Sequence, residues 1–186
     1  MPELIPRSPD NPEFARVVEV RALREIEGFD FDIAPTPDEA AALARLLGAQ
    51  AVRKLRFAGS LSPLDGGGWG LDATLGASVV QTCVVTLEPV TTRVDQTVRR
   101  RFLPMPGFRA AELVIDPEED EEIEPLGDRI DLGLVVIEAL ALALPAYPRK
   151  EGAVLDAAAA GALDDAAEPK PFAALAALRG KLGDAS

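Results

Sequence analysis

The chain has 186 residues, a formal net charge of −12, one cysteine and no histidine. The negative charge argues against general affinity for nucleic acid or anionic membranes, although a local basic patch stays compatible with it. One cysteine and no histidine exclude an intrachain disulfide, a zinc-binding thiolate cluster and the commonest general base. We therefore expect no catalytic residue, no bound metal and no cofactor.

The N-terminus is polar and proline-rich, which is unlike a secretory signal. The most apolar segment, residues 132–144, is shorter than the about 20 residues that a membrane-spanning helix needs. The scarcity of cysteine suits a reducing compartment. These features predict a soluble, cytoplasmic protein without a membrane partner.

The first third of the chain predicts two strands and a helix. Residues 14–21 are predicted as a strand, and the alternation of apolar residues with aspartates over residues 29–33 predicts another. A helix is expected to begin at Pro37, because Thr36 can cap it and Glu39 completes a capping box. A glycine after residue 47 should end this helix.

The centre of the chain predicts a meander of three antiparallel strands. The first carries alternating apolar residues from Leu55 onwards, and Trp69 belongs to the glycine-rich turn that follows it. In the second strand the apolar residues occupy odd positions as far as Cys83 and Leu87. The chain should then turn at Glu88-Pro89 into a third strand. Such alternation is typical of an antiparallel sheet with one covered face.

The second half of the chain is predicted to be less regular. Residues 112–124 carry many carboxylates and no basic residue, which favours a mobile, solvated loop. Asp131 should cap a helix that Pro145 ends. This helix is apolar on nearly every side, so we expect it to be buried in the core or docked on a partner.

These elements predict an α+β fold. Its centre would be a strongly twisted antiparallel sheet, with a partly closed barrel as the alternative and a few helices covering one face. The expected organisation is a flexible segment over residues 1–12 and a single domain over 13–150 that includes an acidic loop at 112–126. A linker over 151–170 and a C-terminal helical segment over 171–186 should follow.

Four sequence elements occur in an order that indicates a family. They read EFARVVEV at residues 13–20, CVVTLEPV at 83–90, IDLGLVVIEALALALPAYPR at 130–149 and PFAALAAL at 171–178. Together they resemble the YceD family, the large ribosomal RNA subunit accumulation proteins. Many members have two cysteines in the central element and some have more near the C-terminus. Here Thr86 and residues 148–150 stand at those places, so a metal-binding role is not expected.

The resemblance implies a non-catalytic role in the accumulation or maturation of 23S ribosomal RNA during assembly of the 50S subunit. It implies ribosomal RNA or large-subunit assembly proteins as partners, with a link to ribosomal protein L32. A protein-interaction adaptor without RNA contact, acting through the acidic loop or the last helix, is the alternative. A hydrolase or nuclease is the least supported class, because no catalytic motif is present.

Basic residues on two of the predicted strands are the candidate RNA or partner contacts. Arginine binds phosphate through paired hydrogen bonds, so a row of such residues on an open sheet face suits RNA. Poor aromatic interleaving argues against a base-stacking platform. The alternative is a solvated face that pairs with the protein's own acidic loop. The candidate residues are Arg53, Lys54, Arg56, Arg93, Arg99, Arg100 and Arg101.

Three further groups are weighed and interpreted structurally. Cys83 is expected in the core, where burial would raise the pKa of its thiol and lower its reactivity. The acidic run is read as a solvated loop, with cation binding or mimicry of RNA phosphates as alternatives. Glu88 and Glu138 would form a carboxylate pair only if the fold brought them together, and a turn and a lone polar position on a helix explain them more simply.

Overall fold

The computed structural model describes residues 11–24, 26–104 and 122–154. The chain divides into two compact units, Met1–Lys150 and Glu151–Ser186, and all the elements below belong to the first unit. The flexible segment, the linker and the last helix predicted above fall almost wholly outside the described residues.

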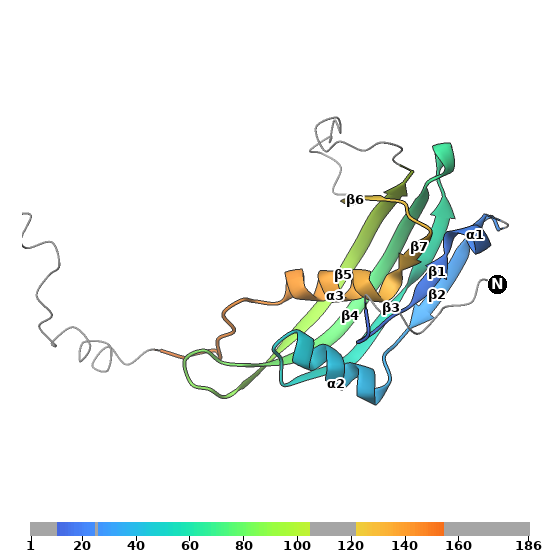
Figure 1. Ribbon diagram of the computed structural model, residues 1–186. Helices are drawn as coiled ribbons and strands as arrows, with labels where there is room; N and C mark the ends of the chain where they lie inside the picture. The colour runs from blue at the N-terminus through green and yellow to red at the C-terminus, as the bar shows by residue number, and fades with distance from the viewer. Residues whose placement is uncertain (1–10, 25, 105–121, 155–186) are drawn as a thin grey trace, which may run out of the picture. The chain divides into compact units, whose positions relative to one another are not determined.

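In the described part of the chain, one five-stranded sheet forms the centre of the first unit (Figure 1). Its strands lie in the order β2, β3, β4, β5 and β6, and they pair antiparallel except for the parallel pair of β5 and β6. The sheet ends at β2 and β6 and does not close into a barrel. The α+β prediction is confirmed. The strands are β2 (Phe29–Ile33), β3 (Ala51–Pro63), β4 (Trp69–Thr82), β5 (Pro89–Leu103) and β6 (Glu122–Pro125).

A small two-stranded sheet joins β1 (Val17–Glu19) to β7 (Arg129–Asp131). The strand predicted over residues 14–21 is therefore shorter than expected. It ends at Glu19, where the chain turns into the short helix α1 (Val20–Leu23).

Both predicted longer helices form with the predicted caps. They are α2 (Pro37–Leu46) and α3 (Leu132–Ala143). At the start of α2 the Thr36 hydroxyl accepts the Glu39 N–H, and the Glu39 carboxylate accepts the Thr36 N–H, so the capping box is complete. At the start of α3 the Asp131 carboxylate accepts the N–H groups of Gly133 and Leu134.

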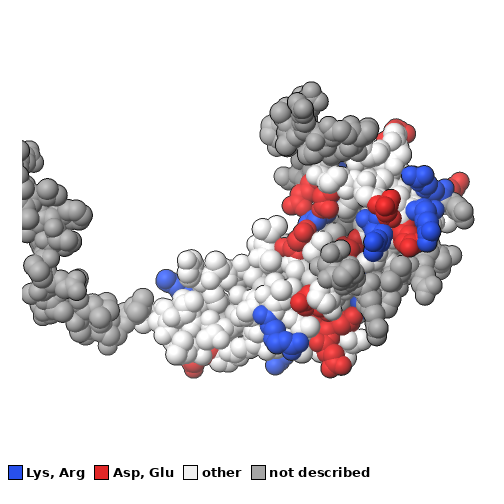
Figure 2. Space-filling view, viewed as in Figure 1, with Lys and Arg blue, Asp and Glu red and all other residues white. Residues whose placement is uncertain are grey.

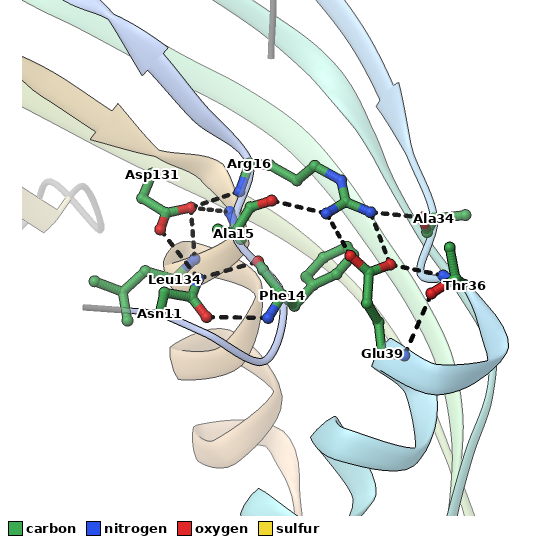
Figure 3. A network of polar contacts seen from close by, with 10 residues as sticks. Asn11, Phe14, Ala15, Arg16, Ala34, Thr36, Glu39, Asp131 and Leu134 are labelled. Carbon is green, nitrogen blue, oxygen red and sulfur yellow. Dashed lines mark hydrogen bonds and ion pairs between the residues drawn. The ribbon is translucent and has the colours of Figure 1, made fainter. Parts of the chain in front are cut away.

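A polar network ties the two helix caps to the N-terminal segment (Figure 3). The Arg16 guanidinium donates to both carboxylate oxygens of Glu39, at 2.8 and 2.9 Å, and its backbone N–H donates to Asp131 at 2.9 Å. Asn11 is 2% exposed and donates to Asp131 and to the Phe14 carbonyl. This network fixes the places where α2 and α3 begin.

The core lies between α3 and the inner face of the sheet, across which α3 runs in Figure 1. The predicted inner rows of β4 and β5 are buried, including Leu75, Val79, Val94 and Phe102. Trp69 is also buried, at 4% exposure, as the first residue of β4, so its placement in a turn was wrong. The helix prediction for residues 132–144 is confirmed, with the side of α3 that faces the sheet in the core.

Two segments depart from the sequence expectations. β4 ends at Thr82, and residues 83–88 form a turn in which Leu87 has φ 59° and is 74% exposed, so the odd-position pattern does not continue as strand. The end of the expected acidic loop forms β6, and residues 105–121 lie outside the described residues. β6 forms because β5 offers an edge to which Glu122 and Glu124 can pair.

Candidate nucleic-acid interface on the open sheet face

A β-bulge in β3 gathers three of the predicted basic residues on the open face of the sheet. The pairing of β3 with β4 shifts between Arg53, which lies opposite Ser78, and Arg56, which lies opposite Gly76. Three residues along β3 are thus matched by two along β4, so β3 contains one extra residue. Lys54 lies within this bulge and adopts φ 52°. Without a bulge, side chains three residues apart would point to opposite faces.

The next strand completes this cationic surface. Arg93 of β5 also lies opposite Ser78, so Arg53 and Arg93 flank one residue of β4 and stand roughly 10 Å apart, two strand spacings. A Cβ on Gly76 would come within 3.0 Å of the Arg93 guanidinium, so the missing side chain lets Arg93 lie close to the sheet. We call Arg53, Lys54, Arg56 and Arg93 the bulge patch.

The floor beside the bulge patch is made of small side chains and forms a shallow depression. Ala58, Thr74 and Thr97 occupy one cross-strand row, and Gly76 lies in the next. The aromatic residues of these strands are Phe57, Trp69 and Phe102, and all three are buried in the core, as predicted for the two phenylalanines. The surface therefore offers charge and close approach, without a ring for base stacking. The depression is lined by Lys54, Arg56, Ala58, Thr74, Leu75, Gly76, Arg93, Asp95, Gln96 and Thr97.

Aspartates of the same sheet pair with several candidate arginines. Arg56 donates to Asp32 at 2.8 and 2.5 Å, and the Arg93 Nε donates to Asp95 at 2.7 Å. These hydrogen bonds raise the pKa of both arginines and lower the pKa of both aspartates. Among the described residues, the carboxylates that pair with Arg56 and Arg93 are thus aspartates of the sheet, and the alternative of pairing with the acidic loop falls mostly outside the described residues.

The positive charge that remains lies at the bulge. Arg53 and Lys54 are exposed, and neither forms an ion pair with another described residue. Further along β5, Arg99 contacts Asp72 at 3.3 Å, and Arg101 is half-buried opposite Gly70. The structure therefore places six of the seven candidates on the open face, with the charge excess at one end of it.

Arg100 is the exception, because it points into the inner face of the sheet. Its side chain is 4% exposed and forms ion pairs with Glu122, Glu124 and Glu138. Burial lowers the pKa of Arg100, but hydrogen bonding with Glu138 and the charges of the other two glutamates outweigh it, so the pKa lies above its ordinary value. Arg100 shares its parity on β5 with Val98 and Phe102, and this signal was available in the sequence. It cannot contact RNA from this position.

A second cationic cluster was not predicted. Arg21 and Arg24, at α1, and Arg129, of β7, line a surface cavity of ≈ 680 Å³ together with Glu19 and Asp128. Figure 2 shows the helix-covered side of the molecule, where basic and acidic groups gather at the α1 end and the surface over α3 is mostly uncharged. The three arginines are far apart in sequence, so only the pairing of β1 with β7 brings them together.

The turn that holds Cys83 meets the segment after α3. The Val84 N–H donates to the Pro148 carbonyl at 2.9 Å, and the Lys150 ammonium contacts Glu88 at 2.9 Å, which lowers the pKa of Glu88. Two elements of the family resemblance, at 83–90 and 130–149, thus come together. Their contact is made by hydrogen bonds and an ion pair.

Cys83 is buried, as predicted, but its pKa shifts in the opposite direction to the prediction. The thiol accepts the backbone N–H groups of Thr86 and Lys150, each at 3.4 Å. A hydrogen bond from the Thr86 side chain and these backbone donors outweigh burial and lower the pKa of Cys83 to about 6. The expectation that burial would raise this pKa was wrong, because donors that stabilise the thiolate dominate over desolvation.

The carboxylates considered for catalysis are held apart by different partners. Glu88 binds Lys150 in the turn, and Glu138 binds Arg100 beside the core. Within the described ranges no group of three or more metal-ligating side chains is close enough to hold a metal ion. Over the same ranges no helix has the length and apolar character to cross a membrane.

The fold and the site define an α+β protein with one helix-covered sheet face and one open, charged face. The chain belongs to the YceD family, since the family model for large ribosomal RNA subunit accumulation protein YceD matches residues 71–179, more than half of its length. The match leaves out the resemblance at residues 13–20 and the β3 part of the bulge patch. No curated protein and no solved structure matches the chain. The family's name ties its members, and so this chain, to the accumulation of large-subunit ribosomal RNA.

Proposed function

We propose that this protein supports the accumulation of 23S ribosomal RNA and assembly of the 50S subunit as a non-catalytic factor that binds ribosomal RNA through the bulge patch. Its place of action is the cytoplasm, where ribosomes assemble. The observation that supports this most strongly is the bulge in β3, which places Arg53, Lys54 and Arg56 on the same face as Arg93.

The chemistry of the patch fits phosphate groups better than bases. Guanidinium groups bind phosphate oxygens through paired hydrogen bonds, and small floor residues allow a sugar–phosphate backbone to approach the sheet. No aromatic ring of β3, β4 or β5 points to the open face. We therefore expect contacts that position an RNA backbone and depend on salt, with little direct reading of sequence.

The aspartates beside the patch do not prevent this contact. Asp32 and Asp95 have side chains that are 53% and 63% exposed, and exposed ion pairs contribute only about 0–1 kcal/mol each. A phosphate can displace them at small cost. The remaining negative charge of the chain should repel RNA elsewhere, so binding is confined to this face.

Complementation of a deletion strain tests the proposal. The triple variant Arg53→Glu, Lys54→Glu, Arg56→Glu should leave 23S ribosomal RNA and 50S particles at the level of the deletion, because the patch becomes repulsive to phosphate. The matched control is Arg21→Glu, Arg24→Glu, Arg129→Glu, which makes the same change of charge at the second cationic cluster and should complement.

Full complementation by the first triple variant, in a protein that folds normally by circular dichroism, would contradict the role of the patch. A deletion strain with normal 23S ribosomal RNA and 50S levels would remove the function itself. If only the control variant failed to complement, the functional interface would instead be assigned to the second cationic cluster at the α1 end.

A protein-interaction adaptor is the second candidate, favoured by an apolar surface at the turn after β4. Val84, Leu87 and Tyr147 are 47%, 74% and 76% exposed, and their segments are joined by the hydrogen bond between Val84 and Pro148. Assembly proteins are its partners, with ribosomal protein L32 suggested by the family resemblance. If the protein is an adaptor, charge reversal of the bulge patch should leave its function intact. The substitution Leu87→Asp should instead abolish binding of its protein partners.

A further inference from the structure

Within the described residues, β5 has a long edge without a partner strand. It runs from Pro89 to Leu103, and β6 pairs only with the segment from Arg100 to Leu103. In the described part of the chain, no strand pairs with the preceding residues of β5 on that side. An open edge of this length is a template for another strand, so its chemistry indicates what it can accept.

The hydrogen bonding of the β4–β5 hairpin fixes which backbone groups face this edge. The Cys83 N–H donates to the Glu88 carbonyl at 2.8 Å, so the backbone groups of these two residues face each other across the hairpin, as in a hydrogen-bonded pair. Such pairs alternate with non-hydrogen-bonded pairs along an antiparallel ladder, and the register is continuous from Thr82 and Pro89 to Trp69 and Phe102. The residues whose N–H and C=O groups point to the free edge are therefore Thr91, Arg93, Asp95 and Thr97.

These four residues are exposed, and the edge has few of the features that block strand addition. Proline occurs only at its first position, the pairing with β4 contains no bulge, and β5 contains no lysine. Natural proteins use such features to prevent association through an edge. Their scarcity suggests that the edge is used.

The charges on the edge select one partner and one register. We propose that two copies of this chain pair antiparallel through β5, about a two-fold axis at Val94. In this register Arg93 lies opposite Asp95 of the second copy, and Thr91 lies opposite Thr97. Each Arg93 then lies between two aspartates, its own Asp95 and that of the second copy.

Neighbouring registers are less favourable. If one strand slides by two residues in one direction, Asp95 of one copy lies opposite Asp95 of the other. If it slides by two residues in the other direction, Arg93 lies opposite Arg93 of the other copy. Like charges directly opposite each other destabilise a strand pair. The chosen register also uses only residues 91–97 for its backbone hydrogen bonds, so the pairing of β6 with β5 is kept. This dimer does not depend on the RNA-binding role proposed above.

Light scattering coupled to size exclusion, from micromolar to hundreds of micromolar protein, tests the dimer. The wild-type chain should approach twice its mass of 19.7 kDa as the concentration rises. Thr97→Pro should remain at the single-chain mass, because it removes an N–H that faces the free edge and spares the bonds to β4. Circular dichroism should show that this variant keeps its fold.

A charge swap provides the matched control. Arg93→Asp or Asp95→Arg alone places like charges opposite each other and should weaken the dimer at least tenfold, whereas the double variant restores opposite charges and should restore it. A single-chain mass at every concentration would overturn the proposal. So would a dimer that forms equally well in Thr97→Pro, since that dimer would use another surface.

Discussion

At the scale of single residues, Arg100 differs from the arginines on either side of it because alternate residues of a strand point to opposite faces of the sheet. Its neighbours Arg99 and Arg101 point to the open face, whereas Arg100 lies between Val98 and Phe102 on the buried face. A buried guanidinium is tolerated only with partners, and three glutamates from β6 and α3 supply them. Arg100 therefore attaches β6 and α3 to the sheet.

We expect Arg100→Met to lower the free energy of unfolding by about 1–3 kcal/mol, because three glutamates lose their shared partner beside the core. These glutamates are partly exposed, which keeps the loss moderate. Arg99→Met is the matched control on the open face and should change stability by less than about 0.5 kcal/mol. Urea denaturation measures both, and equal effects would contradict the structural role of Arg100.

Cys83 gives a second test at this scale, through its lowered pKa. The thiol has a folded-state pKa of about 6 against an ordinary value of 9.0, so the thiolate is favoured in the folded protein. This contribution is fully present above pH 9.0 and is lost as the pH falls through about 6. Stability should therefore rise over this interval, and the rise should vanish in Cys83→Ser. The ultraviolet absorbance of the thiolate should titrate near pH 6, and titration near the ordinary value would contradict the assignment.

At the scale of elements, the helix caps are the best-predicted features, because each depends on residues that are adjacent in sequence. Thr36 and Glu39 form their capping box as expected, and Asp131 caps α3. Asp131 also holds Asn11 and the Arg16 backbone, contacts that span more than a hundred residues and that the sequence pattern could not show.

We expect the two caps to differ in their contribution to stability. Thr36→Ala should cost about 1 kcal/mol, the usual effect of losing an N-cap. Asp131→Ala should cost about 2–4 kcal/mol, because it also leaves Asn11 and the Arg16 N–H without their acceptor in a buried network. Thermal unfolding monitored by circular dichroism compares them, and equal losses would show that the network adds nothing to the cap.

The irregular elements were the ones that local patterns did not reveal. The alternation over residues 71–79 predicts β4 well, but the bulge in β3 depends on how β3 and β4 fit together and not on either strand alone. β6 lies in a run of carboxylates that favours a loop, and its pairing with β5 and Arg100 overrides that preference. The sequence therefore predicted which basic residues belong to the candidate site. Their arrangement in space depends on tertiary contacts, which the sequence pattern did not show.

At the scale of the molecule, the charge is divided unevenly between the two sheet faces. The inner face carries Arg100 with its partners and two glutamines, Gln81 and Gln96, and is otherwise mainly apolar, whereas the open face carries the bulge patch within a chain of net charge −12. Composition alone argued against nucleic-acid binding. The arrangement in space is compatible with it at one surface, and family membership connects the chain as a whole to the accumulation of large-subunit ribosomal RNA.

The salt dependence of RNA binding tests this account most directly. Binding of 23S ribosomal RNA transcribed in vitro would be measured between about 50 and 200 mM salt for the wild type, for Arg53→Gln, Lys54→Gln, Arg56→Gln, and for the control Arg21→Gln, Arg24→Gln, Arg129→Gln. The account predicts that the first variant binds at least tenfold more weakly and loses about 2–3 units of the slope of log affinity against log salt, while the control keeps both. An unchanged affinity and slope in the first variant would contradict it.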